Sequence, residues 1–135
     1  MNSTDDLLRG ILSSAKTIAV VGCSADPTKA SHGVAAYLQA RGYRVIPVNP
    51  RGGEILGESV FPDLPSVPEP VDIVDVFRPP ADCPEVARQA VAIGAKVLWL
   101  QSGIVSPEAA AIAEAGGLAA VMDRCTLQEH RRLLA

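Results

Sequence analysis

The sequence has few aromatic residues, no long apolar run and no cluster of basic residues. Aromatic residues make up 4% of its 135 residues, and the apolar content is mainly Ala, Val, Leu and Ile. No segment approaches the ~20 apolar residues of a membrane-spanning helix, so we expect no membrane association. The net charge of −3 includes no basic stripe, which argues against a nucleic-acid partner.

Cysteine is also scarce, and its spacing excludes two kinds of stabilisation. Cys23, Cys83 and Cys125 lie far apart and form no C-x-x-C pair, so we expect neither a disulfide framework nor a zinc site. Reduced cysteines are typical of the cytoplasm. Asp5 and Asp6 precede the first leucines, whereas a signal peptide begins with cations. We therefore expect a cytoplasmic protein.

What the sequence does contain is an alternation of apolar strand-like runs and helical patterns, within a length that suits one domain. We predict a single α/β domain over residues 1–135, built on a doubly wound, Rossmann-like parallel sheet with strand order 3-2-1-4-5. The predicted strands cover residues 17–21, 44–48, 72–77, 96–100 and 118–121, and the predicted helices begin near residues 4, 32, 84, 107 and 126.

Two features qualify the second strand and the segment after it. Pro47 cannot donate to a ladder, so it must lie near the strand end or where no partner is required. Residues 49–70 are rich in Pro and Gly, and we interpret them as an ordered loop with a brief extended piece around 59–61.

The loop after the first strand has the composition of a phosphate site. Gly22 permits close approach of an anion to the backbone, Ser24 and Ser31 supply hydroxyls, and Lys29 supplies a cation. We expect Ser31 to cap the following helix and Gly33 to let that helix approach the sheet or ligand closely. Neither G-x-G-x-x-G nor G-x-x-x-x-G-K-[ST] is present, so from these residues alone an ordinary loop is an equal alternative.

The loop after the second strand lacks the acidic residue that an NAD site uses for the ribose hydroxyls. Val48 is followed instead by Asn49, Pro50 and Arg51. The planar guanidinium of Arg51 suits a phosphate monoester. Two common ligands carry such a group on the adenosine ribose, NADP and coenzyme A, and a solvated arginine in a Gly-rich turn is the structural alternative.

A longer pattern narrows this choice. The run from Val48 to Gly57, followed by Val60-Phe61-Pro62, resembles the CoA-binding domain family. That family includes small stand-alone bacterial proteins and is similar to the N-terminal domain of the succinyl-CoA synthetase alpha subunit and of ADP-forming acyl-CoA synthetases. The resemblance extends over residues 10–134. Further matching positions are Gly22, Ser24, Pro79, Ser102-Gly103-Ile104 and Asp123-Arg124-Cys125.

The resemblance implies coenzyme A or an acyl-CoA as the ligand, and it assigns roles to the loops. The first loop would face the phosphates, the second the ribose 3′-phosphate, the third the adenine and the fourth the pantetheine. From the residues alone, Phe77 is equally a core side chain and Arg78 a surface charge. The predicted ligand-binding residues are Gly22, Cys23, Ser24, Lys29, Ser31, Asn49, Pro50, Arg51, Phe77, Arg78, Pro79, Gln101, Ser102 and Gly103.

No catalytic set is evident. Succinyl-CoA synthetase uses a phosphohistidine on a separate domain, which this sequence lacks; its histidines are His32 and His130. His32 lies at the start of the phosphate helix, facing ligand or solvent. We expect a packing or helix-end role for His130, because Thr126 and Glu129 beside it have capping-box spacing. The sequence therefore does not predict an enzyme.

The leading hypothesis is a non-catalytic module that binds coenzyme A or an acyl-CoA as a carrier, sensor or accessory subunit. One alternative is an NADP-binding oxidoreductase domain. Another is the CoA-binding subunit of a split acyl-CoA synthetase, and the chain is also a candidate homo-oligomer. Cys23, in the first loop, and Cys125, before a helix N-terminus, are placed for a mixed disulfide with CoA, although small buried thiols are the simpler interpretation.

Overall fold

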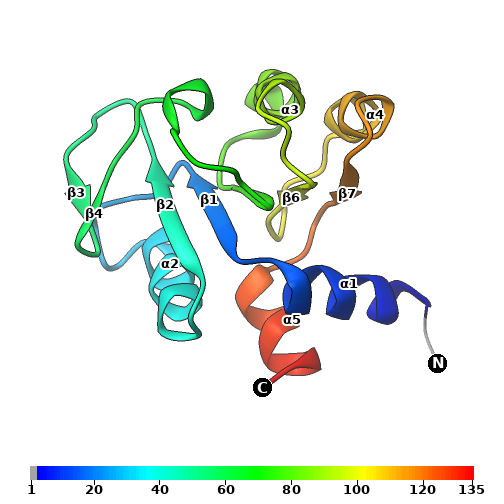
Figure 1. The fold of residues 1–135 in the computed structure, drawn as a ribbon, viewed down its shortest axis with the longest axis horizontal. Helices are drawn as coiled ribbons and strands as arrows, with labels where there is room; N and C mark the ends of the chain where they lie inside the picture. The colour runs from blue at the N-terminus through cyan, green and yellow to red at the C-terminus, as the bar shows by residue number, and fades with distance from the viewer. Residues whose placement is uncertain (1–2) are drawn as a thin grey trace.

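The computed structural model describes residues 3–135, which form five α-helices around a five-stranded parallel sheet (Figure 1). Each predicted helix and strand is present, and the predicted bounds are correct to within two residues. The helices are α1 (Ser3–Ser14), α2 (Ala30–Ala40), α3 (Cys83–Ala92), α4 (Pro107–Ala115) and α5 (Thr126–Leu133). The strands of the sheet are β1 (Thr17–Val21), β2 (Arg44–Val48), β5 (Ile73–Val76), β6 (Val97–Leu100) and β7 (Ala119–Val121).

The strand order is β2-β1-β5-β6-β7, with every pair parallel. In chain order this is 2-1-3-4-5, so the doubly wound sheet is confirmed but the predicted order 3-2-1-4-5 is wrong. The third strand, β5, pairs with β1 and not with β2, which places Ile18 opposite Ile73. In sheets of this order, ligands bind beside the first strand, where the chain reverses its direction of winding.

Pro47 explains why β2 is an edge strand. The carbonyl oxygen of Pro47 faces away from β1 and accepts a hydrogen bond from the Phe61 N–H at 3.1 Å. The nitrogen and the carbonyl of one strand residue point to the same side, so the missing N–H of Pro47 also lies on this outer edge. A further strand along that edge would meet a position that cannot donate. The proline thus disfavours the predicted order, and only the short bridge at Phe61 pairs along this edge among the described residues.

Alternate residues of each strand face two different helical layers. On β1, Ala19 and Val21 belong to a core packed under α3 and α4, whereas Ile18 and Val20 belong to a core packed under α1, α2 and α5. Figure 1 shows these two groups of helices on opposite faces of the sheet. The largest fully buried side chain is Trp99 of β6, whose Nε1 donates to the Arg124 carbonyl oxygen at 2.8 Å.

The segment between β2 and β5 is ordered, as predicted. It forms a small hairpin of β3 (Glu54–Ile55) and β4 (Glu58–Ser59) and then a 3₁₀ turn at Leu64–Ser66. Phe61 forms a parallel bridge with Val48, which confirms the extended piece near 59–61. The segment therefore folds back over the carboxyl end of β2.

The glycines in and after the helices of this fold have different surroundings. Gly33 of α2 is exposed, and a Cβ added there would meet nothing within 4 Å. The expectation that Gly33 lets α2 approach the sheet closely is therefore wrong, because that face of the helix is open, whereas a close approach to a ligand stays a prediction. Gly116, at the end of α4, does permit one: an added Cβ would lie 2.5 Å from a methyl carbon of Val91 on α3.

We predict opposite effects for alanine at these positions. Gly33→Ala should raise the free energy of unfolding by about 0.5–1 kcal/mol, because alanine loses less backbone entropy in a helix. Gly116→Ala should lower it by about 1–3 kcal/mol through overpacking against Val91. Urea denaturation of the purified proteins measures both changes, and a destabilised Gly33→Ala would contradict the open surroundings of α2.

Candidate functional site

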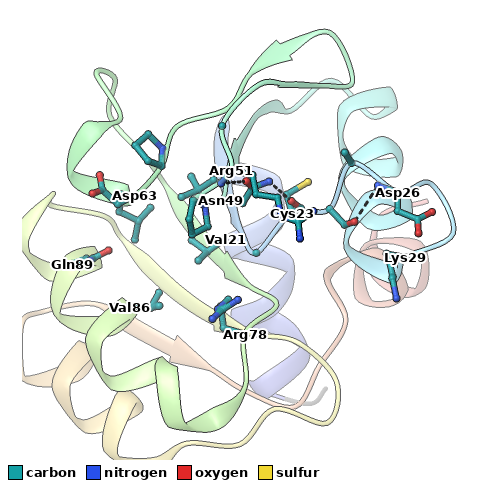
Figure 2. A pocket seen from close by; sticks show the side chains of 18 residues that line it. Val21, Cys23, Asp26, Lys29, Asn49, Arg51, Asp63, Arg78, Val86 and Gln89 are labelled. Carbon is teal, nitrogen blue, oxygen red and sulfur yellow. Dashed lines mark hydrogen bonds between the residues drawn. The ribbon is translucent and has the colours of Figure 1, made fainter.

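A cavity of about 880 Å³ lies at the carboxyl ends of β1 and β2, beside the segment that follows β5 (Figure 2). Its lining residues come from the β1–α2 loop, the loop after β2, the segment 62–64, Arg78, and the face of α3 that carries Val86 and Gln89. This is the position at which a doubly wound sheet of this order binds ligands. Eight of the fourteen predicted ligand-binding residues line it: Gly22, Cys23, Ser24, Lys29, Asn49, Pro50, Arg51 and Arg78.

Gly22 joins the ends of three strands. Its N–H donates to the Val48 carbonyl oxygen at 2.9 Å, and the Phe77 N–H donates to the Val21 carbonyl oxygen at 2.8 Å. Gly22 has a φ of +82°, and a Cβ added there would lie 2.6 Å from the carbonyl oxygen of Phe77. Because backbone cannot yield as a flexible side chain can, this position requires glycine.

The β1–α2 loop is held by its own polar groups. The Ser31 Oγ accepts from the Ser24 N–H at 2.9 Å, and the Ser24 Oγ accepts from the Asp26 N–H at 3.0 Å. Ser31 therefore does not cap α2, contrary to expectation. The helix begins one residue earlier, at Ala30, and the hydroxyl of its second residue turns back to the loop instead.

Asp26 is the carboxylate of this loop, and local donors stabilise its ionised form. Its Oδ1 accepts from both the N–H and the hydroxyl of Thr28, at 2.9 and 2.8 Å, and these bonds lower the pKa of Asp26. The Lys29 side chain, by contrast, forms no hydrogen bond or ion pair within residues 3–135, and its charge also contributes to lowering the pKa of Asp26. The loop thus leaves one cation for a ligand.

The loop after β2 is tied to the first loop by Asn49. The Asn49 Nδ2 donates to the Cys23 carbonyl oxygen at 2.8 Å, and its Oδ1 accepts from the Arg51 N–H, also at 2.8 Å. The Arg51 side chain is exposed at the cavity and makes no ion pair or hydrogen bond with the described residues. The predicted cation after the second strand is therefore unpaired and free to meet an anion.

The charged residues divide the cavity into two ends. Figure 2 shows Lys29 and Asp26 at one end, Asp63, Val86 and Gln89 at the other, and Arg51 between them. Toward the second end, the Asp63 carboxylate is engaged as it accepts from the Ser66 N–H at 3.0 Å. The remaining cation, Arg78, is paired with Asp82 at 2.8 Å.

The second end of the cavity was not predicted. It is lined by Pro62 and Leu64, from the segment after the hairpin, and by Val86 and Gln89 of α3. Val86 and Gln89 are three residues apart and so share a helix face. The sequence analysis considered only loops at strand ends. The helical spacing of Val86 and Gln89 shows that they share a face of α3, but which face of α3 meets the cavity depends on packing.

Six predicted ligand-binding residues do not line the cavity. Ser31 is buried and holds the first loop, as described above. Phe77 is half-buried and packs against the core beneath α1, α2 and α5. Pro79 is exposed and starts a 3₁₀ turn, and Ser102 and Gly103 are exposed after β6.

The sixth, Gln101, belongs to a buried polar cluster with Asp75 and Thr126. The Gln101 Nε2 donates to Asp75 Oδ1 and lies 2.9 Å from Thr126 Oγ1, which donates to Asp75 Oδ2 at 2.9 Å. Asp75 is fully buried, and this burial raises its pKa to about 7, against the effect of the two donors. The sequence analysis overlooked this carboxylate, although a charged residue inside an apolar central strand is a recognisable signal.

Comparison with known proteins identifies the family. The model of a CoA binding domain matches residues 16–131. The chain belongs to the CoA binding domain family. The resemblance found in the sequence is therefore confirmed.

Relatives of this CoA binding domain include whole proteins of similar length. The uncharacterised protein YneT of Bacillus subtilis is 39% identical over 123 residues, which is 91% of each chain. A Thermus thermophilus protein of solved structure is 46% identical with a TM-score of 0.92, over 99% of this chain and 100% of that one.

The same domain also occurs within a larger enzyme. A dinucleotide forming acetyl-coenzyme A synthetase 1 of Ca. Korarchaeum cryptofilum is 26% identical, with a TM-score of 0.69. The match covers 78% of this chain and 25% of the synthetase.

Within the described part of this chain, no helix has the length and apolar character needed to cross a membrane.

The cysteines of the domain are free thiols, and two are buried. Burial, and then the nearby Asp75 carboxylate, raise the pKa of Cys23 to about 11. Burial also raises the pKa of Cys83. At neutral pH the Cys23 thiol is thus protonated and enclosed, which favours the interpretation of a small buried thiol over a mixed disulfide. Cys125 is half-buried and precedes α5.

The last helix differs from the prediction at its start. Thr126 does not form a capping box with Glu129, because its hydroxyl is bonded to Asp75 and the Glu129 carboxylate pairs with Arg124 and Arg132. His130 packs within the fold, as expected. Its Nδ1 lies 2.9 Å from the Tyr37 hydroxyl, and its ring makes edge contacts with two tyrosines.

Asp75 should make stability depend on pH in a defined direction. Its pKa is about 7 in the folded protein and about 3.9 in an unfolded chain. Between these values the folded state keeps a proton that the unfolded state has lost, so the free energy of unfolding should fall as pH rises from about 4 to about 7. Asp75→Asn should remove this slope and be more stable than the parent near pH 8, as measured by urea denaturation.

Asp72, at the start of the same strand, provides the matched control. Burial raises its pKa, but hydrogen bonds from the N–H groups of Thr17 and Lys16 outweigh this effect and the pKa is lowered. Asp72→Asn should therefore lose stability at neutral pH while Asp75→Asn gains it. Parallel pH profiles for Asp75→Asn and the parent would contradict a buried, titrating Asp75.

Proposed function

We propose that the chain binds coenzyme A or an acyl-CoA in this cavity, as a module that does not itself catalyse a reaction. The observation that carries the proposal is the pair of unpartnered cations, Lys29 and Arg51, at a cavity beside β1 in a CoA binding domain. The cavity's carboxylates, Asp26 and Asp63, are already satisfied by local donors. Hydrogen bonds from neutral groups do not cancel the charge of a carboxylate, so the attraction of an anionic ligand depends on direct contact with Lys29 and Arg51.

Arg51 supports a ligand with a phosphate monoester on its ribose, and the CoA binding domain family favours coenzyme A over NADP as that ligand. A guanidinium forms two parallel hydrogen bonds with a phosphate monoester, and coenzyme A carries one on the ribose 3′ position. The chain has no acidic residue after β2 to hold free ribose hydroxyls, since Asn49 stands there with both side-chain polar atoms engaged. The apolar side chains of Leu64 and Val86, at the second end of the cavity, suit an uncharged part of the same molecule.

The absence of a catalytic role is part of the proposal. Among the described residues that line the cavity there is no histidine, and its one cysteine has a raised pKa. No nucleophile with an adjacent base is formed there. Such a site binds and releases its ligand, as a carrier, sensor or accessory subunit does.

A second candidate function is the CoA-binding subunit of a split acyl-CoA synthetase. It is favoured by the match to one quarter of the Korarchaeum acetyl-coenzyme A synthetase. Affinity purification of the tagged chain from its own cells tests it. Recovery of a nucleotide-binding synthetase chain in fixed ratio would support this function, whereas self-association alone would count against it.

The principal experiment is calorimetric titration and thermal unfolding with coenzyme A, acetyl-CoA, dephospho-CoA, NAD, NADP and FAD. We expect coenzyme A to stabilise the protein by about 2.7 kcal/mol at 100 times its Kd. Arg51→Ala should weaken coenzyme A by about 10- to 100-fold, the effect of one hydrogen bond to a charged group, and should leave dephospho-CoA nearly unchanged.

Arg88→Ala is the matched control, because Arg88 is an exposed arginine of α3 that pairs with Glu85 and does not line the cavity. It should change neither affinity. Equal losses for the two ligands in Arg51→Ala would remove Arg51 from the 3′-phosphate. Stabilisation by NADP but not by coenzyme A would replace the proposal with an NADP-binding domain.

A further inference from the structure

Asn49 is a residue whose side chain is used entirely within the protein, between the two loops that hold the unpaired cations. Its Nδ2 donates to the Cys23 carbonyl oxygen and its Oδ1 accepts from the Arg51 N–H, each at 2.8 Å (Figure 2). Its backbone N–H donates to the Phe61 carbonyl oxygen at 3.0 Å. The side chain is thereby held in one orientation at the wall of the cavity, bonded to both loops.

The first of these bonds fixes a peptide plane at the cavity. The Cys23 carbonyl is held by Asn49, and the N–H of the same peptide, from Ser24, is held by the Ser31 Oγ at 2.9 Å. In a planar trans peptide these two groups point in opposite directions, so bonds at both ends prevent the plane from rotating. Without Asn49 the carbonyl would be free to turn its negative end toward a bound phosphate.

The second bond fixes the backbone of Arg51. An Asn side chain that accepts from the N–H two residues later forms an Asx turn. Beyond Arg51 the chain continues through Gly52 and Gly53, with φ of +67° and +93°, where the restraints are two backbone bonds: the Gly52 N–H donates to the Asn49 carbonyl oxygen at 3.3 Å, and the Gly53 carbonyl oxygen accepts from the Val60 N–H at 2.9 Å. The Asn49 side chain supplies the bond to the Arg51 N–H itself. The guanidinium itself has no partner among residues 3–135, so its position depends on the backbone that carries it.

We propose that Asn49 is a positioning residue: it holds Arg51 at a fixed place relative to the Cys23–Ser24 peptide. It thereby sets the preference of the cavity for a ligand with a phosphate monoester on its ribose, without touching that ligand. The inference rests on the proposed function, since it concerns how the cavity distinguishes coenzyme A from dephospho-CoA. It also changes the role of Asn49 from the ligand contact predicted from the sequence.

The test is a double-mutant cycle on Asn49 and Arg51 with both ligands. Asn49→Ala should lower the ratio of dephospho-CoA Kd to CoA Kd by about fivefold, the equivalent of one hydrogen bond. In the Arg51→Ala background, the same change should affect the two ligands equally, because there is no longer a guanidinium to position. Isothermal titration calorimetry measures the four proteins.

Two further variants separate positioning from general loosening. Gln39→Ala removes a 3.1 Å hydrogen bond from α2 to the carbonyl oxygen of Leu56. Leu56 belongs to the same segment after β2 as Asn49 but does not line the cavity, so this variant should leave the ratio unchanged. Asn49→Ser keeps an acceptor for the Arg51 N–H but is too short to reach Cys23. Asn49→Ser should therefore retain a higher ratio of dephospho-CoA Kd to CoA Kd than Asn49→Ala does. It also provides the test if thermal melting shows that the alanine variant is not folded.

Two results would overturn the inference. Equal losses for both ligands in Asn49→Ala would mean that Arg51 is not positioned by Asn49. A selective loss that persists in the Arg51→Ala background would mean that Asn49 contacts the 3′-phosphate itself. Failure of the proposed function is a separate result, seen in the unsubstituted protein as no binding of coenzyme A or in Arg51→Ala as an unchanged ratio.

Discussion

The geometry of the site depends on the missing side chain at Gly22. This residue lies where the ends of β1, β2 and β5 meet. Its N–H is hydrogen-bonded to Val48, and a Cβ added to it would clash with the carbonyl oxygen of Phe77. A larger residue would push the first loop away from β5 and open the meeting point of the strands. Because the sheet changes its direction of winding at β1, this one close approach determines where the cavity forms.

Which charged side chains are available to a ligand at the cavity depends on which of them the fold leaves without a hydrogen-bond or ion-pair partner. The chain as a whole carries a net charge of −3, yet the carboxylates at the cavity are engaged by nearby hydroxyl and N–H groups. Lys29 and Arg51 have no such partners among the described residues. These two cationic side chains are therefore available to an anion on a protein of negative net charge, and because neutral donors do not cancel the charge of Asp26 and Asp63, the anion must contact the two cations directly.

The fold was largely predictable, since apolar runs and capping residues such as Ser106, which accepts from the Ala109 N–H, are local signals. Strand order was not, because it depends on pairing between distant segments; only Pro47 carried a clue to the edge. At the site, strand-end loops were foreseeable from topology. The roles of Ser31 and Asn49 were not, because a polar side chain in a loop serves ligand or backbone equally well until its neighbours are known.

Gln101 shows why a family pattern cannot assign every ligand residue. Its amide is bonded to Asp75 and Thr126, so it joins β6 to β5 and to α5 instead of lining the cavity. A fully buried carboxylate destabilises the fold when it ionises, and these two donors offset only part of that cost. The cluster nevertheless fixes three elements against one another directly behind Cys23, whose pKa Asp75 also raises. The joining of β5, β6 and α5 and the lowered stability at neutral pH thus have the same origin, the buried Asp75 carboxylate.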